Sequence, residues 1–183
     1  MFFALRRLYY GGQIRMKAII YTSNTGSTAE YAQLLGNELN LPVHSLQQAK
    51  NKVPAGSEII YLGWIMAGGI KGYKEAAKLY KVRAVCGVGM GQTGTQLKEV
   101  RDKNAIPQRI PLFTLQGNFD VKKLHGVYRF MMNVMVKTAG KGLANKTDRT
   151  PEEDDMLDMM VNGGKRVSLQ NLKAVTEWYK SVY

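Results

Sequence analysis

The sequence predicts an α/β fold, a three-layer sandwich in which a five-stranded parallel sheet lies between helices, with a helical insertion after the fifth strand. Two observations carry this prediction. Short apolar runs bounded by turn residues alternate with segments of helical periodicity, which is typical of βαβ units. The length of 183 residues, with 45% hydrophobic and 22% charged residues, suits one globular domain with a single core.

The first half of the chain contains three candidate strands. Residues 17–21 predict a short strand, and residues 27–40 follow as a helix with one apolar stripe. Residues 42–46 predict a weaker strand of the kind found at a sheet edge. Residues 58–66 are nearly continuous in apolar side chains, which is typical of a central parallel strand buried on both faces.

The second half of the sheet is predicted from the same alternation. A helix over residues 72–80 precedes a strand over 83–90, and a helix over 95–103 precedes the fifth strand over 110–116. The last helix is expected over residues 169–183. Helices between successive strands are the connections that parallel strands require.

Residues 120–165 separate the fifth strand from the last helix by far more than the usual ~2–6 residues. We therefore predict a helical insertion within a single domain that spans residues 16–183. Thr150, Pro151 and Glu153 fit the start of a helix with a capping box. The acids of that helix are expected to form a solvated face: Asp154, Asp155 and Asp158. An earlier helix is expected from an apolar stripe flanked by positive charge, made of Val127, Phe130, Met131, Val134 and Met135 with Lys122, Lys123, Arg129, Lys137 and Lys141.

Residues 1–15 are predicted to be a short basic extension, because their apolar patch is interrupted by arginines and is too short for a secretory signal. Met16 opens the first strand directly and is an alternative start of translation. The longest apolar run, residues 59–70, is shorter than the ~20 residues of a membrane-spanning helix. The single cysteine, Cys86, excludes an internal disulfide and a cysteine-built metal site, and it predicts a cytoplasmic protein.

Hydroxyl side chains gather in the turn between the first strand and the first helix, Ser23-Asn24-Thr25-Gly26-Ser27-Thr28. Backbone amides of such a turn and of the helix N-terminus point to one place, and the hydroxyls can donate to phosphate oxygens. The lysine of a Walker loop and the glycine pattern of dinucleotide folds are both absent. The turn therefore predicts a phosphate site, and a well-capped helix start without a ligand is the alternative.

This turn resembles the first loop of the flavodoxin superfamily, S/T-x-T-G-x-T, which holds the phosphate of FMN. The resemblance implies FMN as cofactor, with its phosphate on residues 23–28. It also implies that the flavin ring lies between two loops that follow the third and fourth strands, made of Trp64, Ile65, Met66, Ala67 and Gly68 and of Gly87, Gly89, Met90, Gly91 and Gln92. Ligands of open α/β sheets bind at such strand ends. For Trp64, a core position is the alternative to stacking on the ring.

The insertion narrows the resemblance. The stretches 117–120, 128–132 and 135–137 are similar to the menaquinone-dependent protoporphyrinogen oxidase branch of that superfamily. The similarity implies an oxidoreductase that exchanges electrons with a quinone or a redox protein. The loop after Trp64 lacks the arginine or histidine associated with that oxidase, so porphyrinogen oxidation in heme biosynthesis is kept as the alternative. A flavin-free basic binding scaffold is the second alternative.

Charge adds expectations about potential and partners. Lys and Arg number 26 against 14 Asp and Glu, a net charge of +12, and residues 63–70 and 87–95 contain no acid. This positive electrostatic field is expected to favour reduced flavin and a less negative redox potential than that of an acidic flavodoxin.

Residues 121–141 combine an apolar stripe with positive charge, which predicts peripheral contact with an anionic inner membrane surface. A helix that covers its own sheet edge is the alternative. A base-stacking pattern is absent, so nucleic acid is not expected as a partner.

Overall fold

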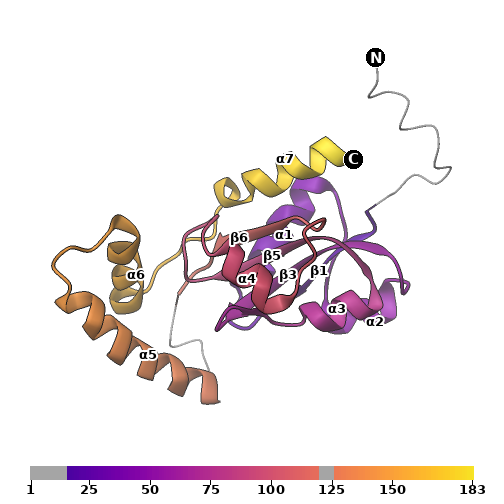
Figure 1. Cartoon of the computed structure of the whole chain (residues 1–183). Helices are drawn as coiled ribbons and strands as arrows, with labels where there is room; N and C mark the ends of the chain where they lie inside the picture. Colours follow the sequence, from indigo (N-terminus) through magenta and orange to yellow (C-terminus); the bar gives the residue numbers. More distant parts are fainter. Residues whose placement is uncertain (1–15, 120–125) are drawn as a thin grey trace.

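The computed structural model describes residues 16–119 and 126–183 and shows an α/β sandwich (Figure 1). Its strands are β1 (Ala18–Thr22), β2 (Val43–Ser45), β3 (Glu58–Met66), β4 (Gly69–Ile70), β5 (Lys81–Gly89) and β6 (Leu112–Gln116). Five of them pair in parallel in the order β2-β1-β3-β5-β6, which is the flavodoxin-like order. The short strand β4 pairs antiparallel with the end of β3. The predicted fold class is confirmed.

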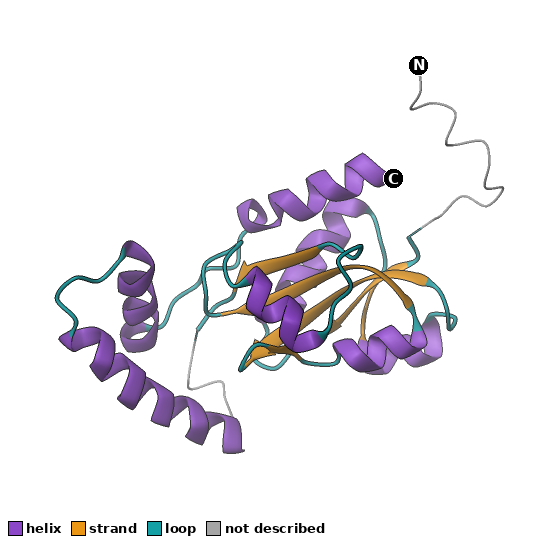
Figure 2. Ribbon diagram, in the orientation of Figure 1, coloured by secondary structure: helices purple, strands orange, loops and turns teal. Residues whose placement is uncertain are grey.

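Helices cover both faces of this sheet (Figure 2). One face carries α1 (Ser27–Leu39) and α7 (Lys173–Val182). The other face carries α2 (Leu46–Lys52), α3 (Tyr73–Leu79) and α4 (Leu97–Asn104). A 3₁₀ turn over Leu169–Leu172 precedes α7, so the expected last helix is divided into two parts.

Strand β3 shows why the sheet is buried on both sides. Side chains of a strand alternate between its faces, and Ile59 and Tyr61 pack in one cluster while Ile60 and Leu62 pack in the other. All four side chains are fully buried. The apolar run in the sequence is nearly continuous because helices cover both faces of this strand, as expected.

Two short elements were not predicted. Helix α2 is polar along most of its length, and Ser45 is its N-cap. The Ser45 hydroxyl accepts from the Gln48 amide, and the Gln48 side chain accepts from the Ser45 amide. Strand β4 contains only two residues, Gly69 and Ile70. Neither element has enough residues to show a periodic pattern in sequence, so only the capping box at Ser45 could have indicated α2.

The insertion contains α5 (Gly126–Asn145) and α6 (Pro151–Asn162), which pack on each other beyond the carboxyl ends of the strands (Figure 1). Helix α6 begins as predicted: the Thr150 hydroxyl accepts from the Glu153 amide, and the Glu153 carboxylate accepts from the Thr150 amide. Within the described residues, no helix is long and apolar enough to cross a bilayer.

Among the acids of α6, Asp154 and Asp158 are exposed, as expected of a solvated face, whereas Asp155 is half-buried. Asp155 accepts from the Gln116 amide group at 2.6 Å and lies 3.2 Å from the Arg166 guanidinium. Asp158 lies 3.2 Å from the same guanidinium, and Asp154 pairs with Arg149. The Asp155–Gln116 contact attaches α6 to the end of β6, a strand far away in sequence. The contacts with Arg149 and Arg166 join α6 to the segments just before and just after it.

Both ends of the insertion meet at one point. Phe119 and Gly164 form an isolated antiparallel bridge, in which each backbone nitrogen donates to the other residue's carbonyl oxygen at nitrogen–oxygen distances of 3.0 and 3.1 Å. The Asn118 side-chain oxygen accepts from the backbone amides of Arg166 and Val167 at 2.6 and 3.0 Å. The insertion therefore leaves and rejoins the sandwich at a closed base.

Parts of two predictions lie outside the described residues. These are the N-terminal extension over residues 1–15 and the first residues, 121–125, of the basic helical segment. The single-domain interpretation of residues 16–183 stays a prediction.

Candidate functional site

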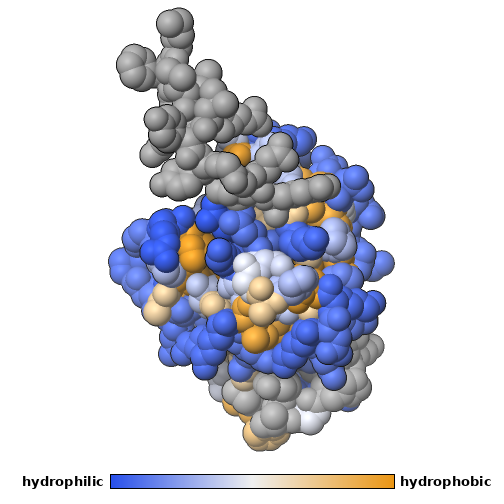
Figure 3. All heavy atoms as spheres, turned by 90° about the vertical axis from the view of Figure 1, so that its right-hand side faces the viewer, coloured by the Kyte–Doolittle hydropathy of each residue, from blue (hydrophilic) through white to orange (hydrophobic). Residues whose placement is uncertain are grey.

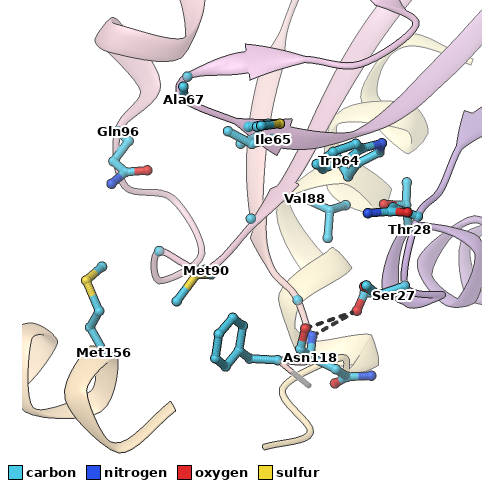
Figure 4. Close-up of a pocket in the computed structure, with 18 of the residues that line it drawn as sticks. Ser27, Thr28, Trp64, Ile65, Ala67, Val88, Met90, Gln96, Asn118 and Met156 are labelled. Carbon is cyan, nitrogen blue, oxygen red and sulfur yellow. Dashed lines mark hydrogen bonds between the residues drawn. The ribbon is translucent and has the colours of Figure 1, made fainter. Parts of the chain in front are cut away.

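A cavity of about 560 Å³ lies at the carboxyl ends of the parallel strands (Figure 4). We call it the carboxyl-edge cavity. It is lined by residues from four loops and from the insertion, namely Asn24, Thr25, Ser27, Thr28, Trp64, Ile65, Met66, Ala67, Gly68, Val88, Gly89, Met90, Gly91, Gln96, Glu99, Gly117, Asn118, Phe119, Met135, Met156 and Met160. Its volume is within the range of ~300–1,000 Å³ typical of small-molecule sites.

The loop after β1 brings the N-terminus of α1 to this cavity. Gly26 is the N-cap with a left-handed φ of 105°, a conformation in which a β-carbon would be strained. Its amide donates to the Ser23 hydroxyl at 3.2 Å, which tightens the turn. Helix α1 has no side-chain cap, so its first-turn amides remain available to an anion. Ser23 and Gly26 shape the loop without lining the cavity.

Ser27 joins this loop to the end of β6 (Figure 4). Its hydroxyl oxygen accepts from the Asn118 amide at 3.0 Å and lies 3.4 Å from the Asn118 carbonyl. A hydroxyl carries only one proton, and here that proton faces a backbone carbonyl. While this contact holds, the Ser27 side chain fixes the loop, and its backbone amide is the group left for a ligand.

The loop after β3 forms the opposite wall. Ala67 and Gly68 both have positive φ, 47° and 74°, in the tight turn between β3 and β4. Buried Asn104 on α4 holds this turn, because its oxygen accepts from the Ile70 amide at 2.8 Å and its nitrogen donates to the Gly68 carbonyl at 2.8 Å. Sequence reasoning did not identify Asn104, whose partners lie more than 30 residues away.

Trp64 lies at the cavity beside Thr28, as Figure 4 shows. The Lys71 ammonium is 5.7 Å from the centre of its indole ring, and the Lys71 amide donates to the Trp64 carbonyl at 3.0 Å. The side chain is half-buried. Trp64 therefore lines the cavity from the end of β3, and its side chain is not fully enclosed in the core.

The loop after β5 contributes Gly89, Met90 and Gly91 to the lining. The Gly89 carbonyl accepts from the Gly117 amide at 2.7 Å, which connects this loop to β6. Gly87 lies within β5 away from the cavity, where a β-carbon would meet Ile65 Cδ1 at 2.8 Å. Gln92 also lies outside the lining. Gly87 therefore serves close packing of β5 on β3.

Several lining residues were missed by sequence reasoning. Gly117, Asn118 and Phe119 follow β6, and the rule that ligands bind at strand ends could have found them. Val88, Gln96 and Glu99 come from β5 and the start of α4. The insertion adds Met135 from α5 and Met156 and Met160 from α6, and no local pattern could have placed these side chains at the cavity.

The cavity has two chemical zones. Hydroxyl and amide groups of the first loop lie at one end with Trp64, and Met156 lies on the far side, past Met90 (Figure 4). The apolar zone, which we call the methionine zone, contains five methionines, whose flexible thioethers adapt to ligand shape: Met66, Met90, Met135, Met156 and Met160. Glu99 is the one charged residue among the described lining residues. The arrangement fits a ligand with a small anionic end and a larger apolar body.

In the parts of the chain that the structure describes, no group of three His, Cys, Asp or Glu residues is arranged so that it could hold a metal ion. Comparison of the sequence and the structure with family models, curated proteins and solved structures found no match. The assignment that the strand order supports is an α/β protein of flavodoxin-like fold.

Proposed function

We propose that this protein binds FMN in the carboxyl-edge cavity and acts as an oxidoreductase. The observation that carries the proposal is the hydroxyl-rich loop after β1, which brings an uncapped helix N-terminus to a cavity of suitable size at the carboxyl edge of the sheet. A phosphate at such a place is favoured by the helix dipole and by the orphan amides.

The phosphate is assigned to the first loop. Thr25 and Thr28 line the cavity and supply hydroxyl donors, while the backbone amides of residues 24–28 supply the rest. Ser27 contributes through its amide, because its hydroxyl is engaged with Asn118. A neutral set of donors suffices for a phosphate at a helix N-terminus, so the absence of a lysine from the described lining is no obstacle.

The flavin ring is assigned to the zone between the loops after β3 and β5. Trp64 and Met66 line one side and Met90 the other, and the glycines of both loops allow close approach of the backbone. Bound FMN would supply reversible transfer of one or two electrons, and the chain would position it and set its potential.

The methionine zone supports a partner with an apolar reacting group. We infer that electrons pass to or from a quinone or a redox protein on the insertion side of this zone, at Met135, Met156 and Met160, since thioethers and the neighbouring Phe119 favour neutral, apolar surfaces. Porphyrinogen oxidation is the weaker candidate, because its substrate carries carboxylates and no Lys or Arg is among the described lining residues.

FMN binding can be tested by titration, following the visible absorption of flavin retained after removal of the excess. We expect the wild-type protein to retain FMN and the Thr25→Ala/Thr28→Ala variant to bind it at least about tenfold more weakly, because two donors to an anion are lost. Thr176→Ala, which alters a half-buried threonine on α7 outside the cavity lining, is the matched control and should bind as the wild type does. Equal binding by the double variant would contradict the assignment of the phosphate, and no binding by any protein would favour a flavin-free scaffold.

A further inference from the structure

We propose that the protein has a second binding site, for small planar aromatic carboxylates, at the opposite end of the sheet. This inference does not depend on the proposed function. The site is a cavity of about 670 Å³ at the amino ends of β5 and β6, which we call the amino-edge cavity. It is bounded by Tyr73, Ala77, Tyr80, Lys81, Val82, Arg83, Pro107, Arg109, Ile110, Pro111, Trp178, Val182 and Tyr183.

The amino-edge cavity is built from both helical layers. Tyr73 and Ala77 belong to α3 on one face of the sheet, whereas Trp178 and Val182 belong to α7 on the other. Figure 3 looks at this end of the molecule and shows apolar surface framed by hydrophilic surface. The carboxyl-edge cavity lies at the other ends of the same strands, so the two cavities share no lining residue.

Aromatic rings form the walls and support one another. Trp178 packs against Phe113 at 6.2 Å and edge-on against Tyr183 at 6.3 Å between ring centres. Tyr179 stacks on Tyr183 at 5.0 Å. Tyr80, from the end of α3, is only 6% exposed. Trp178 and Tyr183 both line the cavity and are half-buried, so these two supported rings offer apolar surface with little freedom to lose when a planar ligand binds.

Positive charge lines the same cavity. Lys81, Arg83 and Arg109 are among its lining residues, and no Asp or Glu is among the described ones. Arg83 lies 3.7 Å from the Glu58 carboxylate and keeps 40% of its side chain exposed. In the parts of the chain that the structure describes, Lys81 and Arg109 form no ion pair. Two cations are thus left to a ligand.

The loop that carries Arg109 has a defined shape. The Arg101 guanidinium donates to the carbonyls of Ile106, Pro107 and Ile110, at 3.3, 2.9 and 3.1 Å. These three hydrogen bonds fix the backbone on both sides of Arg109, whose own side chain is exposed. A guanidinium presented from an ordered loop beside aromatic walls is suited to a carboxylate, because the planar fork can pair with both oxygens.

The combination selects the ligand class. An inorganic anion would leave the aromatic walls unused, and a neutral aromatic compound would leave the cations unpaired. A flat ring with a carboxylate uses both features. The contrast with the carboxyl-edge cavity is direct, since the described lining there contains Glu99 and no Lys or Arg.

Isothermal titration calorimetry with 2-naphthoate as the probe tests the site on the full chain, with and without added FMN. We expect saturable binding that FMN leaves unchanged, with 2-naphthamide and inorganic phosphate each at least about tenfold weaker. The Arg109→Gln and Lys81→Gln variants should each weaken 2-naphthoate several-fold. The control Lys98→Gln removes an exposed lysine on α4 outside this lining and should have no effect.

Three results would overturn the proposal. The first is the absence of 2-naphthoate binding, and the second is binding of the amide as tight as that of the acid. The third is displacement of 2-naphthoate by FMN together with full binding by Arg109→Gln, which would place the probe in the carboxyl-edge cavity. None of these results affects FMN binding itself, so failure here and failure of the proposed function are distinguishable.

Discussion

Two single asparagines fix the loops that form the candidate site, and neither was among the residues predicted from sequence to form it. Asn104 binds the turn after β3, and Asn118 binds the loop after β6 to Glu30 and to the segment after α6. In each case the asparagine side chain supplies hydrogen-bond partners to backbone groups of irregular loops, which have no partner in a helix or a sheet. Truncating the buried Asn104 side chain leaves its backbone partners unsatisfied, which costs about 1–3 kcal/mol per group.

Glu99 gives the redox expectation a test at this scale. It is the charged residue in the described lining of the carboxyl-edge cavity, whereas the flanking loops 63–70 and 87–95 lack acids. We expect FMN bound to the wild type to have a less negative potential than in an acidic flavodoxin. Glu99→Gln should raise the potential further, by an amount on the order of tens of millivolts, because negative charge opposes reduction.

Redox titration with reference dyes measures both values. Glu177→Gln, on the exposed side of α7, is the matched control and should leave the potential unchanged. A lower potential in Glu99→Gln would contradict the electrostatic argument, as would a strongly negative final couple in the wild type.

Among the elements, α5 stands out because its outer side is apolar and basic. Phe130 is 68% exposed and Val134 is 45% exposed. Lys137 and Lys141 follow at helical spacing on the same side. Met135, one position along from Val134, lines the carboxyl-edge cavity instead. The helix therefore has one side toward the site and another toward the surroundings.

We propose that this outer side contacts an anionic membrane surface, as amphipathic basic helices do. The full chain should sediment with vesicles that contain phosphatidylglycerol and remain in solution with phosphatidylcholine alone. Phe130→Gln/Val134→Gln should reduce sedimentation several-fold. Val161→Gln, which alters a 70% exposed apolar residue on α6, is the control. Undiminished sedimentation of the double variant would show that charge alone, or another surface, is responsible.

For the whole molecule, buried titratable groups set the response of stability to alkali. Burial raises the pKa of the Cys86 thiol from 9.0 to about 12, and burial also raises the pKa values of four tyrosines above 10.0: Tyr31, Tyr61, Tyr73 and Tyr80. Above about pH 9 the unfolded chain therefore releases protons that the folded chain retains. The unfolded state then binds fewer protons, so the free energy of unfolding must fall as pH rises.

Urea unfolding followed by circular dichroism, from about pH 8 to about pH 11, measures this loss. Cys86→Ala should flatten the first part of the decline, because it removes the group with the lowest unfolded pKa in the set. A free energy of unfolding that stays constant or increases over this range would contradict the prediction.

Much of this molecule could be predicted from local pattern. The alternation of apolar runs predicted all five parallel strands, and the Thr150 capping box predicted the start of α6. The first-loop pattern, the resemblance it carries and the strand-end rule together predicted one site made of residues 23–28, 64–68, 87 and 89–92. Most of these residues line one cavity, and Ser23, Gly26, Gly87 and Gln92 do not. These features depend on neighbours in sequence or on the general geometry of parallel sheets.

The remainder depends on distant partners. The contacts of Asn104, the pairing of Asp155 with Arg166 and the presence of Met156 at the cavity all join segments whose relative placement no local periodicity reports. Glu99 shows how this affects the candidate site. The loop sequences 63–70 and 87–95 contain no acid, but Glu99 lines the cavity from α4.

The paired base of the insertion has a consequence for how such a protein can change over evolutionary time. Because Phe119 and Gly164 are hydrogen-bonded to each other, the intervening chain is a loop whose ends are already together. Doubling the length of a flexible loop costs only about 0.6 kcal/mol in closure entropy. Segments of quite different length and composition could replace it without disturbing the sheet, and each would bring new side chains to the methionine zone while the hydroxyl loop stayed the same.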